Sequence, residues 1–329
     1  MTVKKLAIGL PMALLLLLFI GRPVLAGLRV DGALIQDTVA PGDQRTYNFG
    51  VSDTTEEPMD VTIQVMGYGE KNGNLAALAP EQDTGPYSAR QFLSVSTNRF
   101  HLEPGERRDI TLAASVPGDA SGGRYAVVYV VQSPPEGSSG AVAVAAVAIP
   151  VLLTIKDTEL KRTGEIEKID LVPGESPGQV TVNARLTNTG NYHYKFRATA
   201  TIRDTANNVL GASDPVEANS SLIPGLSRLI SIPVTVKKEM PPGEYIAEVE
   251  IRQMEKDIPL AGGEVGVTLE PAPAGATEPA KFKADEIVTG KVASAAVQGG
   301  GFDWKYAGTL GGAAVVILIL VLVIILRKR

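Results

Sequence analysis

The chain repeats part of its own sequence. Residues 102–131 read LEPGERRDITLAASVPGDASGGRYAVVYVV, and residues 222–251 read LIPGLSRLISIPVTVKKEMPPGEYIAEVEI. The second segment follows the first at a constant offset of 120 positions without a gap. Its identical positions are Leu222, Pro224, Gly225, Arg228, Ile230, Val236, Gly243 and Tyr245, which match Leu102, Pro104, Gly105, Arg108, Ile110, Val116, Gly123 and Tyr125. A repeat spaced by about the size of a domain indicates two copies of one fold.

Each copy has the pattern of paired β-strands. Near its start each copy has a Pro-Gly dipeptide. This pair favours a turn because proline presets φ and glycine supplies a positive φ. Apolar residues then alternate with polar ones, as in Ile230, Ile232 and Val234. A second strand opens on the tyrosine, and its alternation predicts that Tyr125 and Tyr245 point into the cores of their own domains. Strand, turn and strand with alternate burial predict two tandem immunoglobulin-like β-sandwiches, an all-β fold.

The composition excludes several classes of protein. The net charge is −5 with acids and bases interspersed, which is unlike the basic surface of a nucleic-acid-binding protein. Cysteine is absent, so the chain has no disulfide framework and no thiolate metal site. Only His101 and His193 are present, and no nucleophile elbow, zinc-binding His-Glu-x-x-His, phosphate loop or calcium loop occurs. The sequence therefore predicts a protein that is not an enzyme, binds no nucleic acid and takes no small-molecule cofactor.

The two ends of the chain predict export and anchoring. Residues 1–26 have two lysines, an apolar run and a small-residue site at Ala26, which is typical of a cleavable signal peptide; an uncleaved anchor is the alternative. Residues 307–326 are uncharged and long enough to cross a bilayer as one helix. Trp304 and Tyr306 precede this run, and the basic residues 327–329 follow it, which places the C-terminus in the cytoplasm and the sandwiches outside. A buried soluble helix would need a polar face, which this run lacks.

These features divide the chain into segments. The signal peptide covers residues 1–26, the first sandwich 27–157 and the second sandwich 158–270. A stalk rich in proline, alanine and glycine covers 271–306 and would reach roughly 30 Å as a flexible chain. The transmembrane helix covers 307–326, and a basic tail covers 327–329. Within the first sandwich, residues 141–155 form an apolar run that we interpret as its closing strand, bent at Pro150.

The stretch 192–197 offers one candidate binding site. If it is a strand, Tyr192, Tyr194 and Phe196 face one way, and His193, Lys195 and Arg197 face the other. One interpretation is that the rings are core and the bases only a solvated face. The other is a basic strip of His193, Lys195 and Arg197 that holds an anionic wall polymer or an acidic partner. The sequence leaves both open.

The motifs also resemble known bacterial surface proteins. Residues 92–95, 100–107 and 123–125 (FLSV, FHLEPGER, GRY) look like the first domain of pilus-chaperone-like immunoglobulin folds. Residues 186–191 and 242–245 (LTNTGN, PGEY) resemble related bacterial sandwich modules. The whole layout is similar to the WxL-interacting surface proteins of Gram-positive bacteria. That resemblance implies a wall-binding first domain and a second domain that contacts surface or host proteins.

We therefore expect a non-catalytic, membrane-anchored binding or scaffolding protein of the bacterial cell envelope. Its expected partners are an envelope polymer or a surface protein, and the lipid bilayer through the C-terminal helix. A chaperone-like assembly factor that acts by β-strand complementation is the first alternative, and an unpaired edge on residues 141–155 would favour it. A hydrolase with an unrecognised carboxylate pair is the second alternative, and a deep acidic cleft would favour it.

Overall fold

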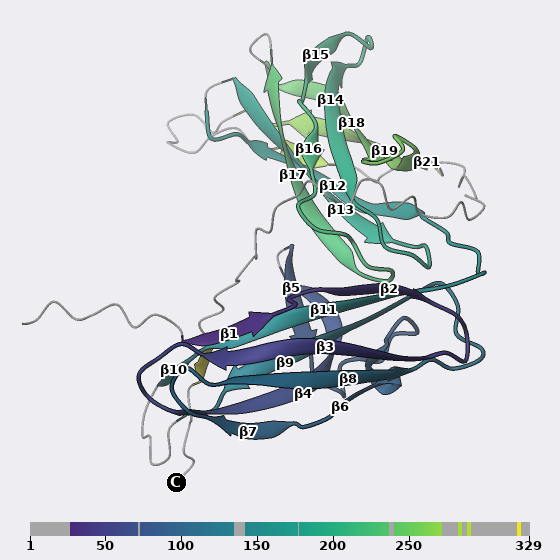
Figure 1. Cartoon of the computed structure of the whole chain (residues 1–329). Coiled ribbons are helices and arrows are strands. Elements are labelled where there is room, and N and C mark those ends of the chain that lie inside the picture. The colour runs from purple at the N-terminus through teal and green to yellow at the C-terminus, as the bar shows by residue number, and fades with distance from the viewer. Residues whose placement is uncertain are drawn as a thin grey trace, which may run out of the picture.

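The computed structural model describes residues 27–71, 73–134, 142–176, 178–236, 240–271, 282–284, 288–290 and 321–323. Within these residues the chain is almost entirely β-structure, and its one short helical turn is the 3₁₀ segment Arg90–Phe92. Figure 1 shows two sandwiches, with strands β1 to β9 and β11 in one and strands β12 to β19 and β21 in the other. The all-β, immunoglobulin-like class predicted from the sequence is confirmed.

The first sandwich has two sheets. One sheet has the order β1-β3-β8-β6, and the other has the order β2-β11-β9-β4-β5, with β7 also paired to β4. The strands are β1 (Leu28–Asp31), β2 (Ile35–Val39), β3 (Gln44–Asp53), β4 (Met59–Lys71), β5 (Asn74–Leu78), β6 (Leu93–Val95), β7 (Arg99–Leu102), β8 (Arg107–Ser115), β9 (Gly123–Gln132), β10 (Val142–Val144) and β11 (Ala146–Ile155). The predicted closing strand is present as β11, whereas β10 forms a separate two-stranded sheet with β22.

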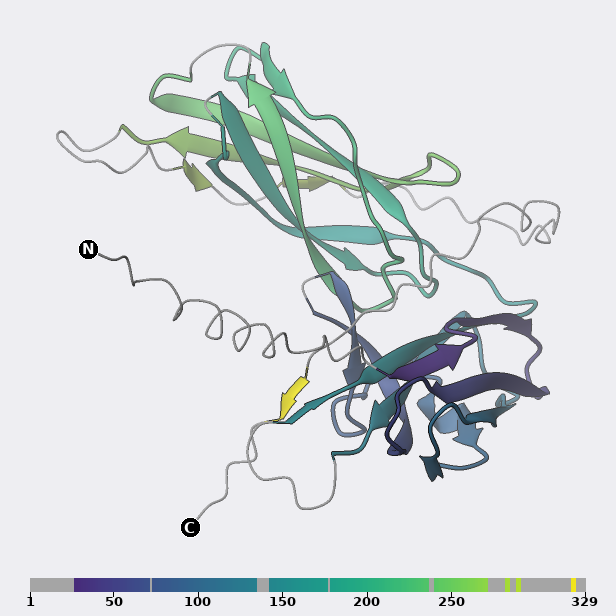
Figure 2. The same ribbon diagram turned by 60° about the vertical axis from the view of Figure 1, so that its left-hand side comes forward.

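The second sandwich is one continuous sheet that folds over itself, in the order β12-β13-β17-β15-β14-β18-β19-β20. The short strand β15 pairs with both β14 and β17 and so joins the two layers. The strands are β12 (Gly164–Pro173), β13 (Gln179–Asn188), β14 (Phe196–Asp204), β15 (Val209–Ala212), β16 (Val216–Glu217), β17 (Ser227–Val236), β18 (Gly243–Gln253), β19 (Pro259–Leu269), β20 (Phe282–Ala284) and β21 (Val288–Gly290). Figure 2 shows both layers from the side.

The internal repeat falls on equivalent strands. β8 and β17 take the same place next to β3 and β13, and β9 and β18 follow them in each domain. The two turns also agree, since Gly105 has φ of 75° and Gly225 has φ of 78°. Positive φ is the reason that both turns use glycine. One fold is therefore present twice.

The prediction that each tyrosine points into the core of its own domain is confirmed for Tyr245 and wrong for Tyr125. Tyr245 lies in the core of the second domain, but Tyr125 lies outside the core of the first domain, in a separate cluster with Leu152 and Ile223. The residues of β9 that enter the first core are Ala126, Val128 and Val130. Because β9 is apolar at nearly every position, alternation does not determine which face is buried, and a shift of one residue reverses every side chain.

Two segments near the C-terminus differ from the expected stalk and helix. Phe282–Ala284 and Val288–Gly290, within the predicted stalk, form strands on the edge of β19, and Phe282 packs against the second core. Val321–Val323, within the predicted transmembrane helix, form the strand β22, antiparallel to β10. Valine and leucine favour strands as well as apolar surroundings, so hydropathy alone does not fix a helix here.

The rest of the predicted terminal segments lies outside the described residues. This holds for the signal peptide at 1–26, for most of the stalk and the helix, and for the basic tail at 327–329. Among the residues that the structure describes, no helix is both long and apolar enough to cross a membrane.

Candidate functional site

The two sandwiches meet through aromatic residues, and the contact centres on Tyr125. Its phenolic oxygen lies 3.0 Å from Nδ1 of His193 and also accepts a hydrogen bond of 3.0 Å from the His193 backbone N–H. Tyr125 is almost fully buried, at 1% exposed. Gly123 makes room for the ring, because a Cβ at this position would lie 1.8 Å from the tyrosine oxygen. Burial raises the pKa of Tyr125, so the hydroxyl keeps its proton.

His193 is enclosed on its other faces. Its ring stacks on Tyr192 at 4.2 Å between ring centroids, and the guanidinium of Arg162 lies over the Tyr192 ring. Burial, assisted by the charge of Arg162, lowers the pKa of His193 to about 4. The imidazole is therefore neutral at pH 7. A neutral ring whose Nδ1 has no proton can accept the hydrogen bond from Tyr125.

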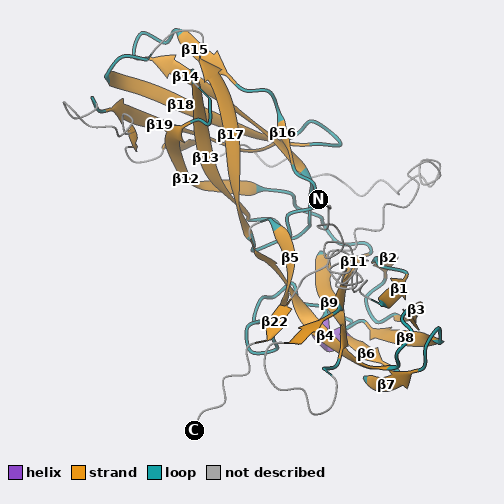
Figure 3. Cartoon of the chain, turned by 90° about the vertical axis from the view of Figure 1, so that its left-hand side faces the viewer, coloured by secondary structure: helices purple, strands orange, loops and turns teal. Residues whose placement is uncertain are grey.

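An ion pair stands beside this aromatic contact. Arg228 of β17 donates from Nε and Nη2 to the two carboxylate oxygens of Glu70, at 2.6 Å and 2.5 Å. Both side chains are buried, at 9% and 6% exposed. Arg228 also donates to the carbonyl of Ser220 at 2.9 Å. Glu70 lies near the end of β4, in the hairpin with β5 that reaches toward the second sandwich in Figure 3.

Backbone contacts complete the junction. The Gly123 N–H donates to the carbonyl of Asn191 at 2.8 Å, and Gly122 N–H donates to the Thr158 hydroxyl at 3.0 Å. Gly122 has φ of +70°, and a Cβ there would lie 2.8 Å from the Asn191 carbonyl oxygen. Only glycine satisfies both conditions. The junction thus has an apolar centre, a buried ion pair and direct backbone bonds, which together fix one domain against the other.

The structure separates the three residues of the predicted basic strip. Tyr194 and Phe196 are buried in the second core as expected. His193 is neutral and bonded to Tyr125, and Arg197 is paired with Asp257 at 2.5 Å. Lys195 is exposed. The three side chains therefore do not form a row of free cations, and anion binding by His193, Lys195 and Arg197 stays a prediction.

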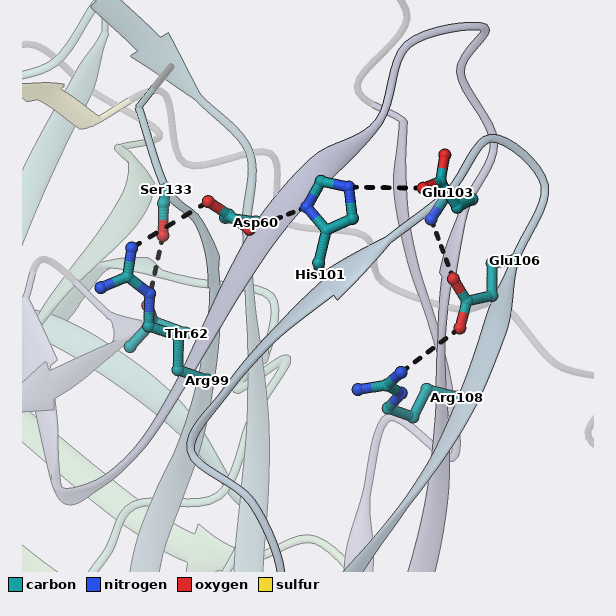
Figure 4. A network of polar contacts seen from close by, with 8 residues as sticks. All are labelled: Asp60, Thr62, Arg99, His101, Glu103, Glu106, Arg108 and Ser133. Atoms are coloured by element: carbon teal, nitrogen blue, oxygen red, sulfur yellow. Dashed lines mark hydrogen bonds and ion pairs between the residues drawn. The ribbon is translucent and has the colours of Figure 1, made fainter. Parts of the chain in front are cut away.

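The other histidine belongs to a polar network on the surface of the first sandwich (Figure 4). Nδ1 of His101 on β7 lies 2.9 Å from Asp60 of β4, its partner across the strand pair, and Nε2 lies 3.8 Å from Glu103. The hydrogen bond to Asp60 raises the pKa of His101. Arg99 lies 4.0 Å from the same aspartate. These exposed contacts join β4 to β7, and among the described residues no group of histidine and acidic side chains could hold a metal ion.

One strand edge of the first sandwich is only partly covered. β11 pairs with β9 over Ala146–Thr154, but β2 pairs only with Val151–Ile155. On the side of β11 opposite to β9, no described strand pairs with residues 146–150. The neighbouring strand β10 pairs with β22. The sequence identified residues 141–155 as the place where an unpaired edge would matter, and the edge is open over the first half of β11.

Among the comparisons with known proteins, the search of solved structures gave matches. No family model and no curated protein matches the chain. A chaperone–tip adhesin complex of CFA/I fimbriae biogenesis is 11% identical, with 79% of this chain and 98% of that chain covered and a TM-score of 0.38. The CsuC–CsuE chaperone–tip adhesion subunit complex of Acinetobacter baumannii is 10% identical, covering 70% and 95%, with a TM-score of 0.37. A PapD-like domain of human CEP192 is 12% identical, covering 48% and 99%, with a TM-score of 0.30.

The structures to which this chain is similar thus include pilus chaperones. The resemblance to WxL-interacting surface proteins stays a prediction.

Proposed function

We propose that this chain is a non-catalytic assembly or binding protein that captures an extended segment of another protein by β-strand addition. The open edge of β11 at residues 146–150 carries the proposal. Strand addition uses main-chain hydrogen bonds for affinity and alternate side chains for specificity. A strand that is paired on one side and open on the other has main-chain N–H and C=O groups available for these hydrogen bonds.

The register of β11 identifies the groups that would bind. In an antiparallel ladder, alternate residues bond to a given neighbour. The Gln132 N–H bonds to the Ala145 carbonyl, so the odd-numbered residues of this stretch bond to β9. Ala146 and Ala148 then direct their N–H and C=O groups to the open side. Pro150 directs only a carbonyl there, because proline has no N–H. The open edge is short and ends at a proline, a pattern that limits pairing between copies of one protein.

Export and anchoring form part of the same proposal. The signal-like segment at 1–26 and the apolar run at 307–326 support a protein held at the outer side of a membrane with its C-terminus inside. In that anchored state Val321–Val323 would lie in the membrane instead of pairing with β10. A tethered strand-binding protein meets its partners at a raised local concentration. The partner class is a surface or envelope protein with an extended segment. Attachment to an envelope polymer, which the sequence also suggested, would use a different surface.

A photo-crosslinking experiment tests strand capture. The full chain carries a photoreactive amino acid at Ala148 or, as a control, at the exposed Asp109 on the opposite sheet. We expect a discrete protein adduct in living cells from position 148 and none from 109. Ala146→Pro, which removes an N–H from the open side, should abolish the adduct, whereas Ala146→Ser should keep it. Equal adducts from both positions, or no adduct from position 148, would refute strand capture.

A further inference from the structure

A buried carboxylate in the first sandwich has too few partners. Asp53 ends β3 and is 1% exposed. Its Oδ1 accepts a hydrogen bond of 2.7 Å from the Thr55 N–H and lies 2.7 Å from the Thr55 hydroxyl. Among the described residues, its Oδ2 has no hydrogen-bond partner. An ionised carboxylate offers about four acceptor sites, and leaving a buried charge without partners is costly.

The Thr55 hydroxyl does not repair this deficit. It lies 2.7 Å from Oδ1 of Asp53 and also 2.7 Å from the carbonyl of Glu57. A hydroxyl has one proton and donates to one acceptor at a time. When it bonds to Glu57, the Asp53 carboxylate keeps a single donor, the Thr55 N–H. A strong donor that reaches Oδ2 would supply the missing partner.

The start of β1 lies beside this carboxylate. Leu28 is the cross-strand partner of Asp53, and the Gly27 carbonyl accepts hydrogen bonds from the Thr54 N–H at 2.7 Å and the Thr54 hydroxyl at 3.0 Å. The Asp53 carboxylate bonds to residue 55 through Oδ1, and residue 27 lies across the ladder from Thr54. Residue 27 is thus held in place next to Asp53 by bonds to its own carbonyl.

Residue 27 also has to be glycine. A Cβ at this position would lie 1.9 Å from Cγ2 of Thr55, whose hydroxyl is engaged on its other side. The backbone of residue 27 therefore packs directly against the turn that holds Asp53. This position directly follows Ala26, the small residue that ends the predicted leader.

We propose that the missing partner of Asp53 is the α-ammonium group of Gly27, which exists only after the leader is removed. A leader peptidase adds water across the bond between Ala26 and Gly27. The Ala26 carbonyl becomes a carboxylate, and the Gly27 nitrogen becomes an amine that takes up a proton. The resulting ammonium has three donors and a full positive charge, which an amide N–H lacks. Processing thereby completes the first sandwich with a buried ion pair between β1 and β3.

The inference uses the proposed removal of the leader and does not depend on strand capture by β11. The following test can therefore fail while strand capture still holds. The chain from Gly27 to Arg329 is released in detergent from an amino-terminal fusion by a protease that leaves no added residue. A matched form has one extra serine before Gly27, which moves the ammonium away from Asp53. Asp53→Asn is made in both forms. Asp31→Asn, which changes a half-exposed carboxylate of β1 that pairs with Arg29 and Arg107, is the control.

The readouts are the pKa of the α-amino group and the thermal midpoint of unfolding. A free α-amino group has a pKa of about 8, and a carboxylate within contact distance raises it by about one unit or more. We expect this rise in the Gly27 form, its loss in Asp53→Asn and no change in Asp31→Asn. The serine extension should lower the midpoint by several degrees, on the order expected for losing one strong interaction, and should have no effect in Asp53→Asn.

Two results would overturn the inference. One is an ordinary α-amino pKa in the Gly27 form. The other is a serine extension that lowers the midpoint by the same amount in the unsubstituted chain and in the Asp53→Asn variant. The mass of the protein from its own cells tests leader removal separately, since a mature chain that begins elsewhere contradicts processing at Gly27 but says nothing about β11.

Discussion

The hydroxyl of Tyr125 in the first sandwich and His193 in the second share two hydrogen bonds, one to the ring nitrogen and one from the backbone nitrogen, both of 3.0 Å. The tyrosine oxygen accepts from the backbone N–H, and it donates to Nδ1 in the tautomer whose Nδ1 carries no proton. Burial disfavours the protonated ring, so the contact between the domains is most stable with a neutral histidine, and its stability depends on pH.

The first prediction concerns this pH dependence. Burial lowers the pKa of His193 from 6.5 to about 4 in the folded chain, so the unfolded chain binds the proton more readily. The stabilisation is present above about pH 6.5 and is lost as the pH falls toward 4. The full difference corresponds to about 3 kcal/mol. We expect the unfolding free energy to fall over this window and His193→Gln to flatten the fall.

The chain has two histidines, which makes the measurement direct. Their ring signals are followed by NMR as the pH changes. His193 should titrate well below 6.5, and His101, whose pKa is raised by its bond to Asp60, should titrate above it. A His193 signal that titrates at an ordinary value would show that the ring is open to solvent and that the domains do not close on it.

The second prediction contrasts the two repeated tyrosines. Truncation of either to alanine should cost about 3–5 kcal/mol, as for other large buried aromatics. The affected regions should differ, because Tyr245 lies in the core of its own domain and Tyr125 lies between the domains. Hydrogen exchange should show local opening of the second sandwich in Tyr245→Ala. In Tyr125→Ala it should show loss of protection around His193 while the first core stays protected. The same exchange map for both variants would contradict the assignment.

The third prediction concerns the repeated turns. A Cβ added at Gly105 or Gly225 would meet no neighbouring group within 4 Å, yet both residues have a positive φ. Alanine at either position should therefore cost about 1–2 kcal/mol through backbone strain alone. Gly118→Ala is the matched control, because its site is equally open and its φ is not positive. Calorimetry gives the loss of unfolding free energy in each of the three variants. If Gly118→Ala loses as much as the other two, backbone strain from a positive φ is not the explanation.

The sequence predicted the architecture because local rules decide it. The Pro-Gly turns at Gly105 and Gly225 and the alternation in β8, β13 and β17 determine strands and buried faces without reference to distant residues. Tyr194 and Phe196 entered the core as predicted because polar residues occupy the alternate positions. Tyr125 was placed on the wrong side because β9 is apolar on both faces, so its period does not select one.

The junction between the domains could not be predicted from local patterns. Glu70 and Arg228 are 158 positions apart, and each is an ordinary charged residue near a strand end. Only the docking of the β4–β5 hairpin on β17 brings them together. Two residues of the candidate strip, His193 and Arg197, have partners that local patterns could not predict for a related reason. Their partners Tyr125 and Asp257 come from segments that the strip's own sequence does not specify.

The last prediction concerns the buried ion pair. Removing one partner of a buried pair leaves the other charge without compensation and typically costs about 3–5 kcal/mol. Glu70→Ala should therefore destabilise the junction strongly, whereas Glu248→Ala, which removes a half-exposed partner of Arg203, should cost less than about 1 kcal/mol. Calorimetry of the full chain gives both values. Replacement of Glu70 and Arg228 together by methionine removes both charges and keeps apolar bulk, so it should recover much of the loss. The single variants Glu70→Met and Arg228→Met are measured beside it. If the double variant loses as much unfolding free energy as the two single variants together, the residues act independently, and the ion pair does not hold the domains together.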